Sequence, residues 1–321
     1  MQLILRRLAH LLVVLLLVTL FVASLTSMLP GDPVDSLIPL ADTTPGVVEQ
    51  KEELRQELGL DDPIYEQWGR WVGNFATGDF GNYYTVSGVR PVMDRVRESL
   101  PVSLQLVLEA QVLALVFAIP LGVFSAYRAG SRFDRASNAT AFGMLAIPPF
   151  ALALALSYYL GVRLGWLPVS GYVAPRDDLG EHIRRMAMPA ISLAVGQVAV
   201  YMRLLRSDMI QTLQEDFITM AKSKGISPSR VLWRHALRPS SLTLLTVAGL
   251  NVGTLIGGAV IVEVLFSLPG LGTLLFEAIQ ARQYIALQSL VALIAIGYVL
   301  INVLIDILYG VLDPRIRHAR A

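Results

Sequence analysis

The sequence contains no cysteine, and charged residues are scarce in it. The absence of cysteine excludes a disulfide framework, a thiolate metal site and a cysteine nucleophile. Charged residues make up 16% of the 321 residues, whereas a soluble domain usually carries about 25%. The formal net charge of +1 gives no indication of a nucleic-acid partner, because such a partner requires a basic excess. The scarcity of charge instead favours a chain embedded in lipid.

Motifs for enzyme chemistry are also absent. No G-x-x-x-x-G-K-[ST] phosphate loop occurs, so the sequence shows no ATP site of its own. The four histidines, His10, His182, His235 and His318, lie on different segments without the spacing of metal ligands. Serine, histidine and aspartate do not cluster, and no paired catalytic carboxylates can be argued. We therefore expect no metal site, no cofactor bound by this chain and no chemistry on a substrate.

Long apolar stretches dominate the chain. Apolar residues make up 54% of it, and the mean hydropathy is +0.57. A helix needs roughly 20 apolar residues to cross a bilayer, and the stretches that fit are 8–28, 102–127, 136–162, 187–205, 241–267 and 285–312. The sequence thus predicts an all-α polytopic membrane protein with about six transmembrane helices. Pro120, Pro148 and Pro149 predict kinks in the second and third of these.

The first apolar stretch resembles a signal peptide, because Arg6 and Arg7 precede it. A cleavable signal has an apolar region of only about 7 to 15 residues, and this stretch is longer. We therefore expect a retained first helix, with a cleaved signal as the alternative.

The positions of the basic residues predict the topology. With six spans and both termini in the cytoplasm, the loops around 128–135 and 203–239 and the tail 313–321 are basic and lie inside. The external segments are acidic in sum, although the loop 163–185 carries more arginine than acid. The predicted parts are an N-terminal transmembrane helix (1–29), a large external segment (30–100), a five-helix membrane domain (101–312) that includes the loop 203–239, and the tail.

The external segment predicts helices of its own. Thr44-Pro45 and Asp62-Pro63 are each a cap residue followed by a proline at the first helical position. After Asp62, an apolar face forms at helical spacing from Ile64, Trp68, Trp71, Val72 and Phe75. We expect this helix to lie against its own protein or at the lipid interface. A docking surface or lid for a delivered ligand is the alternative.

The loop 203–239 predicts two short helices. The first, at 208–223, places on one side the apolar residues Met209, Leu213, Phe217, Met220 and Ala221. Gly225 ends this helix. Ser227 then caps a second helix with Pro228 at its first position, and its apolar side is supplied by Val231, Leu232 and Trp233.

The spacing within this loop resembles a known family. Ala221 lies four residues before Gly225, His235-Ala236-Leu237 begins ten residues after it, and Pro239 closes the run. This resembles the cytoplasmic coupling loop of binding-protein-dependent ABC importer permeases. Four further stretches resemble the B-type permease of the peptide and nickel branch: Leu29-Pro30-Gly31-Asp32-Pro33, Leu58-Gly59-Leu60-Asp61 with Gly78-Asp79-Phe80-Gly81, Phe266-Ser267-Leu268-Pro269-Gly270-Leu271-Gly272, and Tyr309-Gly310-Val311-Leu312-Asp313-Pro314-Arg315.

The chain departs from the family pattern at three positions. Arg238 stands where the family often has a proline, Thr219 stands in place of the usual acidic residue, and Gln283 replaces a common aspartate before the sixth span. These departures concern the subfamily rather than the class.

The resemblance implies a type I ABC importer permease, a pore-forming subunit of the cytoplasmic (inner) membrane. It implies a second, C-type permease subunit, two separate ATP-binding subunits that hold ATP and magnesium, and an external solute-binding protein. Di- or oligopeptides are the commonest cargo of this branch, while nickel complexes, glutathione, haem and sugars are others. The residues that it places at the ATPase contact are Asp216, Phe217, Thr219, Ala221, Lys222, Lys224, Gly225, Ser227, Arg230 and His235.

The physical logic of such a loop is independent of the family. A short helix along the membrane face can fit a groove on a partner, with apolar residues supplying contact area. Lys222, Lys224 and Arg230 can meet acidic groups at the rim. A loop that packs only on its own helices is the alternative.

Polar residues inside the apolar stretches are candidates for a translocation path. An ionised side chain at the membrane centre costs roughly 2.5–3.5 kcal/mol on insertion scales, so such groups should face other helices or water. The candidates are Glu109, Gln111, Asn251 and Glu263. Interhelical hydrogen bonding is an equal alternative for Glu109 and Glu263 and the preferred one for the amides.

Two other classes of protein compete with the importer permease. An ion-coupled secondary transporter could use Glu109 and Glu263 as its coupling carboxylates. A structural or assembly protein would leave the polar residues of the spans without a task.

Overall fold

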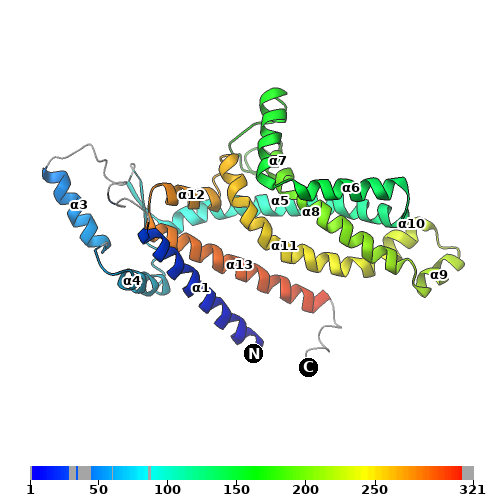
Figure 1. Ribbon diagram of the computed structural model, residues 1–321, viewed down its shortest axis with the longest axis horizontal. Helices are drawn as coiled ribbons and strands as arrows, with labels where there is room; N and C mark the ends of the chain where they lie inside the picture. The colour runs from blue at the N-terminus through cyan, green and yellow to red at the C-terminus, as the bar shows by residue number, and fades with distance from the viewer. Residues whose placement is uncertain (1, 29–33, 35–44, 60, 86–87, 313–321) are drawn as a thin grey trace. The chain divides into compact units, whose positions relative to one another are not determined.

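The computed structural model describes residues 2–28, 34, 45–59, 61–85 and 88–312. The motifs expected at 29–33 and 313–315, and Leu60 of a third, lie outside the described residues. The chain forms two compact units: residues 1–102 with 269–300, and residues 103–268 with 301–321. Each unit is mostly helical (Figure 1).

The first unit combines helices with one hairpin. Its elements are α1 (Gln2–Met28), α3 (Pro45–Leu58), α4 (Ile64–Ala76), β1 (Asn82–Thr85), β2 (Gly88–Pro91), α12 (Leu271–Gln280) and parts of α5 (Val92–Tyr127) and α13 (Tyr284–Leu312). The two strands pair antiparallel with Asn82 opposite Pro91. An apolar core lies around Tyr83, Val92, Leu274 and Leu290, and burial raises the pKa of Tyr83 to about 12.

Helix α4 lies against its own chain through two tryptophans. Trp71 is buried, and its indole nitrogen donates to Ser289 Oγ at 2.9 Å. Trp68 donates to Thr19 Oγ1 on α1 at 3.2 Å. A buried indole N–H usually requires such a partner, so these contacts fix the face of α4 that points inward. They agree with the first of the two interpretations expected for this helix.

Gln283 explains one departure from the family pattern. Its Oε1 accepts the backbone N–H of Tyr84 at 2.8 Å, and its amide nitrogen donates to the carbonyl of the same residue. An ionised carboxylate cannot donate a hydrogen bond. Glutamine therefore makes both hydrogen bonds to Tyr84 on β1, whereas an ionised aspartate could only accept the bond from the Tyr84 N–H.

The second unit carries the remaining membrane helices. Its further elements are α6 (Arg132–Ala146), α7 (Pro149–Leu156), the π-helical η1 (Ser157–Arg163), α8 (Leu179–Thr212), α9 (Asp216–Ser223), α10 (Pro228–Arg230), the π-helical η2 (Val231–Ala236) and α11 (Leu237–Leu265). At 1.5 Å per residue, the 34 residues of α8 extend about 50 Å. This exceeds the roughly 30 Å of a bilayer hydrocarbon core, so α8 is longer than the core that it could cross.

Four helices among the described residues are long and apolar enough to cross a membrane, and a bent pair makes a fifth. The stretch 12–25 of α1 and helix α12 are shorter apolar helices. The bent pair confirms the kink that Pro148 and Pro149 predict in the apolar stretch 136–162. There α6 ends, and the following helices turn by 95° (Figure 1). The residue before a proline avoids the helical region, and Ile147 before Pro148 is extended.

Small residues line the apolar core of the second unit, and one of them allows α5 to approach α8 closely. Ala114, Ala118, Ala194 and Ala199 are buried in the apolar core of this unit. A Cβ added at Gly122 would lie 3.0 Å from the carbonyl oxygen of Met202. Such a close approach of backbones is how membrane helices gain packing energy, because lipid tails are as apolar as leucine and provide no hydrophobic drive.

The helices of the loop 203–239 differ from the expectation. Residues 208–212 continue α8, so the first short helix is confined to α9. The second is not separate either, because α10 continues through η2 into α11, and residues 228–265 form one apolar helix. Of the residues expected on the apolar side of the first helix, Met209 belongs to α8 and Leu213 precedes α9. Met209 and Ala221 are buried, while Phe217 and Met220 are 46% and 58% exposed.

Candidate coupling site

The corner after α9 is built around Gly225. This residue has a φ of +73°, the left-handed region that glycine adopts without strain. The Gly225 N–H donates to the Lys222 carbonyl at 3.0 Å, and the Ile226 N–H donates to the Ala221 carbonyl at 3.2 Å. This pair of bonds is the Schellman arrangement that satisfies the last carbonyls of a helix. The predicted end of the helix at Gly225 is confirmed.

Helix α9 has a buried side and an exposed side. Ile218 and Ala221 are buried in the core that also contains Met209 and Val231. The exposed side carries Asp216, Phe217, Thr219, Met220 and Lys222. The helix is thus anchored to its own unit by two small-to-medium apolar side chains. Two larger apolar side chains, Phe217 and Met220, remain on the surface.

The chain after the corner adds cations to the same segment. Lys224 and Arg230 are exposed, as are Gly225 and Ser227, while His235 is half-buried. Ser227 occupies the position before α10, and Pro228 is the first helical residue, as predicted, although the serine side chain makes no capping hydrogen bond.

A cavity of about 450 Å³ lies beneath this corner. It is mostly apolar and carries one cation, and its lining residues are Ala126, Tyr127, Ala129, Ile210, Leu213, Gln214, Lys222, Ile226, Pro228, Val231 and Leu232. The cavity thus lies between the corner and the ends of α5 and α8.

Helix α9 is joined to the ends of three long helices. Thr212 at the end of α8 shares a hydrogen bond with Ser240 on α11, with hydroxyl oxygens 2.9 Å apart. Trp233 on η2 stacks edge-on against Phe124 on α5, with ring centroids 6.2 Å apart. These contacts tie the segments on either side of α9 to the ends of α8, α11 and α5.

A buried carboxylate fixes the neighbouring turn between α5 and α6. Asp134, whose side chain is 4% exposed, accepts from Arg206 on α8, with Nη2 to Oδ2 at 2.7 Å. It also accepts from Ser125 Oγ at 2.6 Å, from the Gly130 N–H at 2.9 Å and from Asn138 Nδ2 at 2.9 Å. The buried charge of Asp134 is tolerated because it is paired with a cation and accepts several hydrogen bonds. Sequence reasoning missed this pair because 72 residues separate its members.

The candidate residues of the translocation path have partners within the chain. Glu109 Oε1 lies 2.8 Å from His182 Nε2. Gln111 accepts from the Tyr201 hydroxyl at 3.1 Å and donates to the Ala248 carbonyl at 3.3 Å. Asn251 donates to Gln197 at 2.9 Å. These contacts support the structural interpretation of the two amides.

The fourth candidate, Glu263, is buried, with 1% of its surface exposed. It sits near the end of α11, two residues before Leu265, where that helix stops.

The chain belongs to the family of binding-protein-dependent transport system inner membrane components. The family description matches residues 118–318, and the description of the N-terminal part of such membrane components matches residues 1–107. The protein is therefore a membrane-embedded permease of an ABC transport system. Membership of this family decides against an ion-coupled secondary transporter and against a purely structural protein.

Relatives of similar length align with nearly the whole chain. The di/tripeptide transport system permease protein DppB of Pseudomonas aeruginosa is 37% identical over 335 residues, which cover 98% of each chain. The oligopeptide transport system permease protein AppB of Bacillus subtilis is 36% identical over 311 residues, covering 95% of this chain and 96% of its own.

A solved structure has the same fold. The MetNI methionine ABC transporter in an inward-facing conformation matches with a TM-score of 0.57 at 15% identity, covering 69% of this chain and 97% of the other. The likeness confirms the fold of an ABC importer permease.

Proposed function

We propose that this permease imports short peptides, with α9 and its Gly225 corner as the contact for an ATP-hydrolysing subunit. The relatives named for peptides support the cargo. The exposed Phe217 and Met220, rimmed by Lys222, Lys224 and Arg230, support the contact, because an apolar centre with a charged rim is the composition of a protein interface.

The assembly follows from the same proposal. A second permease subunit completes the pore, two ATP-binding subunits supply ATP and magnesium, and an external solute-binding protein delivers the peptide. Six spans place both termini and the loop 203–239 in the cytoplasm. Glu109, Gln111, Asn251 and Glu263 remain candidates for the path, and the contacts of the first three make them elements that hold the helices around it.

Replacement of Gly225 tests the coupling role. A residue with a Cβ in the left-handed region costs about 1–2 kcal/mol, and a β-branched side chain costs more. We expect Gly225→Val to reduce ATP-dependent dipeptide uptake by the reconstituted assembly about tenfold or more.

The matched control for this change is Gly225→Asn, because asparagine tolerates a positive φ, and an added Cβ meets no atom within 4 Å there. Uptake by this variant should stay near the wild-type level. Equal uptake by the valine and asparagine variants would contradict a role for the corner.

The topology can be tested with single cysteines, because the chain has none of its own. Thr219→Cys on α9 and Ser170→Cys before α8 should react with a membrane-impermeant maleimide from opposite sides of the membrane. Labelling of both from the same side would overturn the proposed six-span topology.

A further inference from the structure

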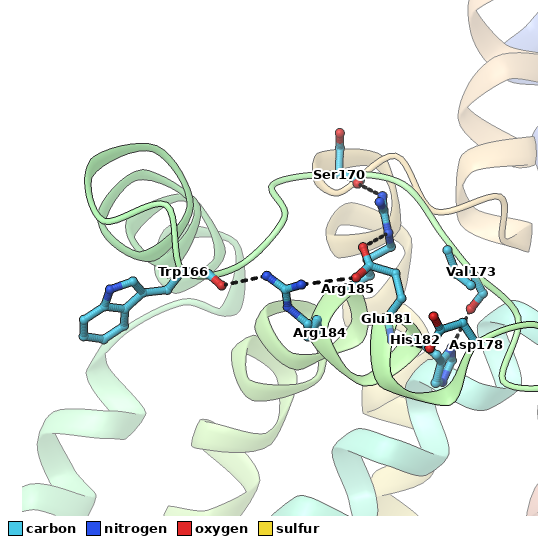
Figure 2. Close-up of polar contacts among 8 residues, drawn as sticks. All are labelled: Trp166, Ser170, Val173, Asp178, Glu181, His182, Arg184 and Arg185. Carbon is cyan, nitrogen blue, oxygen red and sulfur yellow. Dashed lines mark hydrogen bonds and ion pairs between the residues drawn. The ribbon is translucent and has the colours of Figure 1, made fainter.

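The segment 164–178 is clamped to the start of α8 through its backbone. Figure 2 shows three side chains of α8 directed toward carbonyls of this segment. Arg185 Nη1 donates to Ser170 O at 2.8 Å, and Arg184 Nη2 lies 3.5 Å from Trp166 O. His182 Nδ1 is 2.7 Å from Val173 O (Figure 2). The segment also donates from the Gly171 N–H to the Phe266 carbonyl at 3.0 Å, so the clamp reaches the end of α11.

The imidazole of His182 has two fixed partners. Its side chain is 4% exposed, and its second nitrogen, Nε2, lies 2.8 Å from Glu109 Oε1 on α5. A carbonyl oxygen can only accept a hydrogen bond, and an ionised carboxylate can only accept one too. Both ring nitrogens of His182 therefore face acceptors when Glu109 is ionised.

A count of hydrogens shows what this arrangement requires. A neutral imidazole carries one N–H, so it can satisfy either Val173 or an ionised Glu109 but leaves a lone pair against the other. The contact is complete with an imidazolium beside a carboxylate, or with a neutral imidazole beside a protonated Glu109. Both forms hold one proton more than the neutral and ionised pair, and the proton belongs to the pair rather than to either residue.

We infer that His182 and Glu109 form a proton-binding site whose occupancy closes the clamp between α5, α8 and the segment 164–178. Loss of the proton leaves two acceptors facing at hydrogen-bond distance, so one of the two contacts opens. The His182 side chain is 4% exposed and the Glu109 side chain 32%, so the unsatisfied ring nitrogen is the buried group. Its cost shifts the ratio of closed to open clamp by about tenfold or more. The clamp is therefore closed at lower pH and opens as the pH rises.

The groups nearest to His182 and Glu109 are neutral or have partners of their own. On the segment, the Tyr172 ring lies edge-on to the His182 ring with centroids 5.9 Å apart. Its hydroxyl donates to Gln105 at 2.6 Å, and burial raises the pKa of Tyr172, so this phenol stays neutral. On α8, Asp178 caps the Glu181 N–H at 2.9 Å, and Glu181 pairs with Arg185 at 2.9 Å.

The other helices that pack on α8 add little charge near the pair. Helix α7 contains no titratable residue. Helix α11 contributes Glu263 toward this end and Arg238 toward the other. The charges of α6, Arg132, Asp134 and Arg135, lie at the end where Asp134 meets Arg206.

A spin label on the segment measures the clamp directly. Ser170 is exposed, and Ser170→Cys gives a unique attachment site because the chain has no cysteine. In the full-length chain within its assembly, we expect the label to be immobile at low pH and mobile at high pH. The same label at the exposed Asn74→Cys on α4 reports any general effect of pH.

The variant Glu109→Gln separates the proton from the contact. A glutamine amide can donate to Nε2 while Nδ1–H still donates to Val173, so this variant closes the clamp without binding a proton. We expect its Ser170 label to stay immobile at every pH. The inference is overturned if the label becomes equally mobile in wild type and Glu109→Gln as the pH rises. It is also overturned if the label stays immobile in both.

A second measurement applies if the variant does not assemble. Nitrogen-15 spectra of histidine-labelled wild type, assigned with His182→Gln, report the protonation of both ring nitrogens. Loss of the proton from either member of the pair changes the hydrogen bond at Nε2. Shifts of both ring nitrogens that stay constant across the pH range therefore also overturn the inference. None of these readouts requires transport, so their failure is distinct from failure of the proposed import function.

Discussion

The two ends of α8 are held by side-chain pairs of different chemistry. Near Leu179, His182 faces Glu109. Near Thr212, Arg206 faces Asp134. A guanidinium stays charged at any pH a protein meets, whereas an imidazole changes charge near neutrality. Arg206 thus keeps its charge beside Asp134 under all ordinary conditions, whereas the bonds of His182 depend on which of its ring nitrogens carries a hydrogen.

The largest effect should come from breaking the permanent tie. Asp134→Ala removes the acceptor of four donors and leaves Arg206 without its carboxylate. Loss of one partner of a buried ion pair typically costs about 3–5 kcal/mol. We expect a loss of unfolding free energy of this order, measured by denaturant titration of the purified assembly with helical circular dichroism.

The control for this change is Asp177→Ala at the opposite end. Asp177 is 64% exposed and lies 3.6 Å from Arg176, an exposed pair of the kind that contributes about 1 kcal/mol or less. Similar losses in both variants would show that burial of the Asp134 pair is not what matters.

A smaller effect is expected from a change at the His182 end of α8 that leaves His182 and Glu109 in place. Arg185→Met removes the bonds to Ser170 O and Glu181, and a hydrogen bond to a charged group contributes about 1.5–3 kcal/mol, less here because the guanidinium is partly exposed. Hydrogen exchange of the segment 164–178 should accelerate.

Arg184→Met is the matched control for this prediction. The Arg184 side chain is 57% exposed, and its contacts are longer, at 3.4 and 3.5 Å. Its replacement should change exchange little, and an equal acceleration would contradict the ranking of the two arginines.

The smallest effect on stability should come from a change in the middle of α8. Tyr201→Phe removes the hydroxyl that donates to Gln111 Oε1, and hydrogen bonds between membrane helices average about 0.6 kcal/mol. We expect a loss of that order in the same unfolding measurement. The exposed Tyr159→Phe is the control, and a loss at Tyr201 as large as that at Asp134 would mean that the middle of α8, rather than its ends, holds the bundle.

Local features of the site could be predicted from sequence because they depend on neighbouring residues. Gly225 ends α9 because its backbone needs a positive φ, and Pro228 starts α10 because a proline fits the first turn. The break at Pro148 follows from the steric demands of a proline on the residue before it.

The lengths of the helices were harder to predict. Residues 208–212 continue α8 and α10 runs into α11, because tertiary packing of Met209 and Val231 outweighs the polarity that suggested a loop. Phe217 and Met220 share the helical spacing of Ala221 but not its burial. Periodicity shows that a face is apolar and does not show what covers it.

The sequence by itself determined that this chain is built of membrane helices, with a corner at Gly225 and a helix start at Pro228, since hydrophobicity, glycine and proline act over a few residues. Only the tertiary structure decided the partners of the buried charges. His182 and Glu109 are 73 residues apart and Arg206 and Asp134 are 72 residues apart. Their pairing is settled by helix packing, because a charge in a lipid-embedded chain is stable only where folding brings it a counterpart.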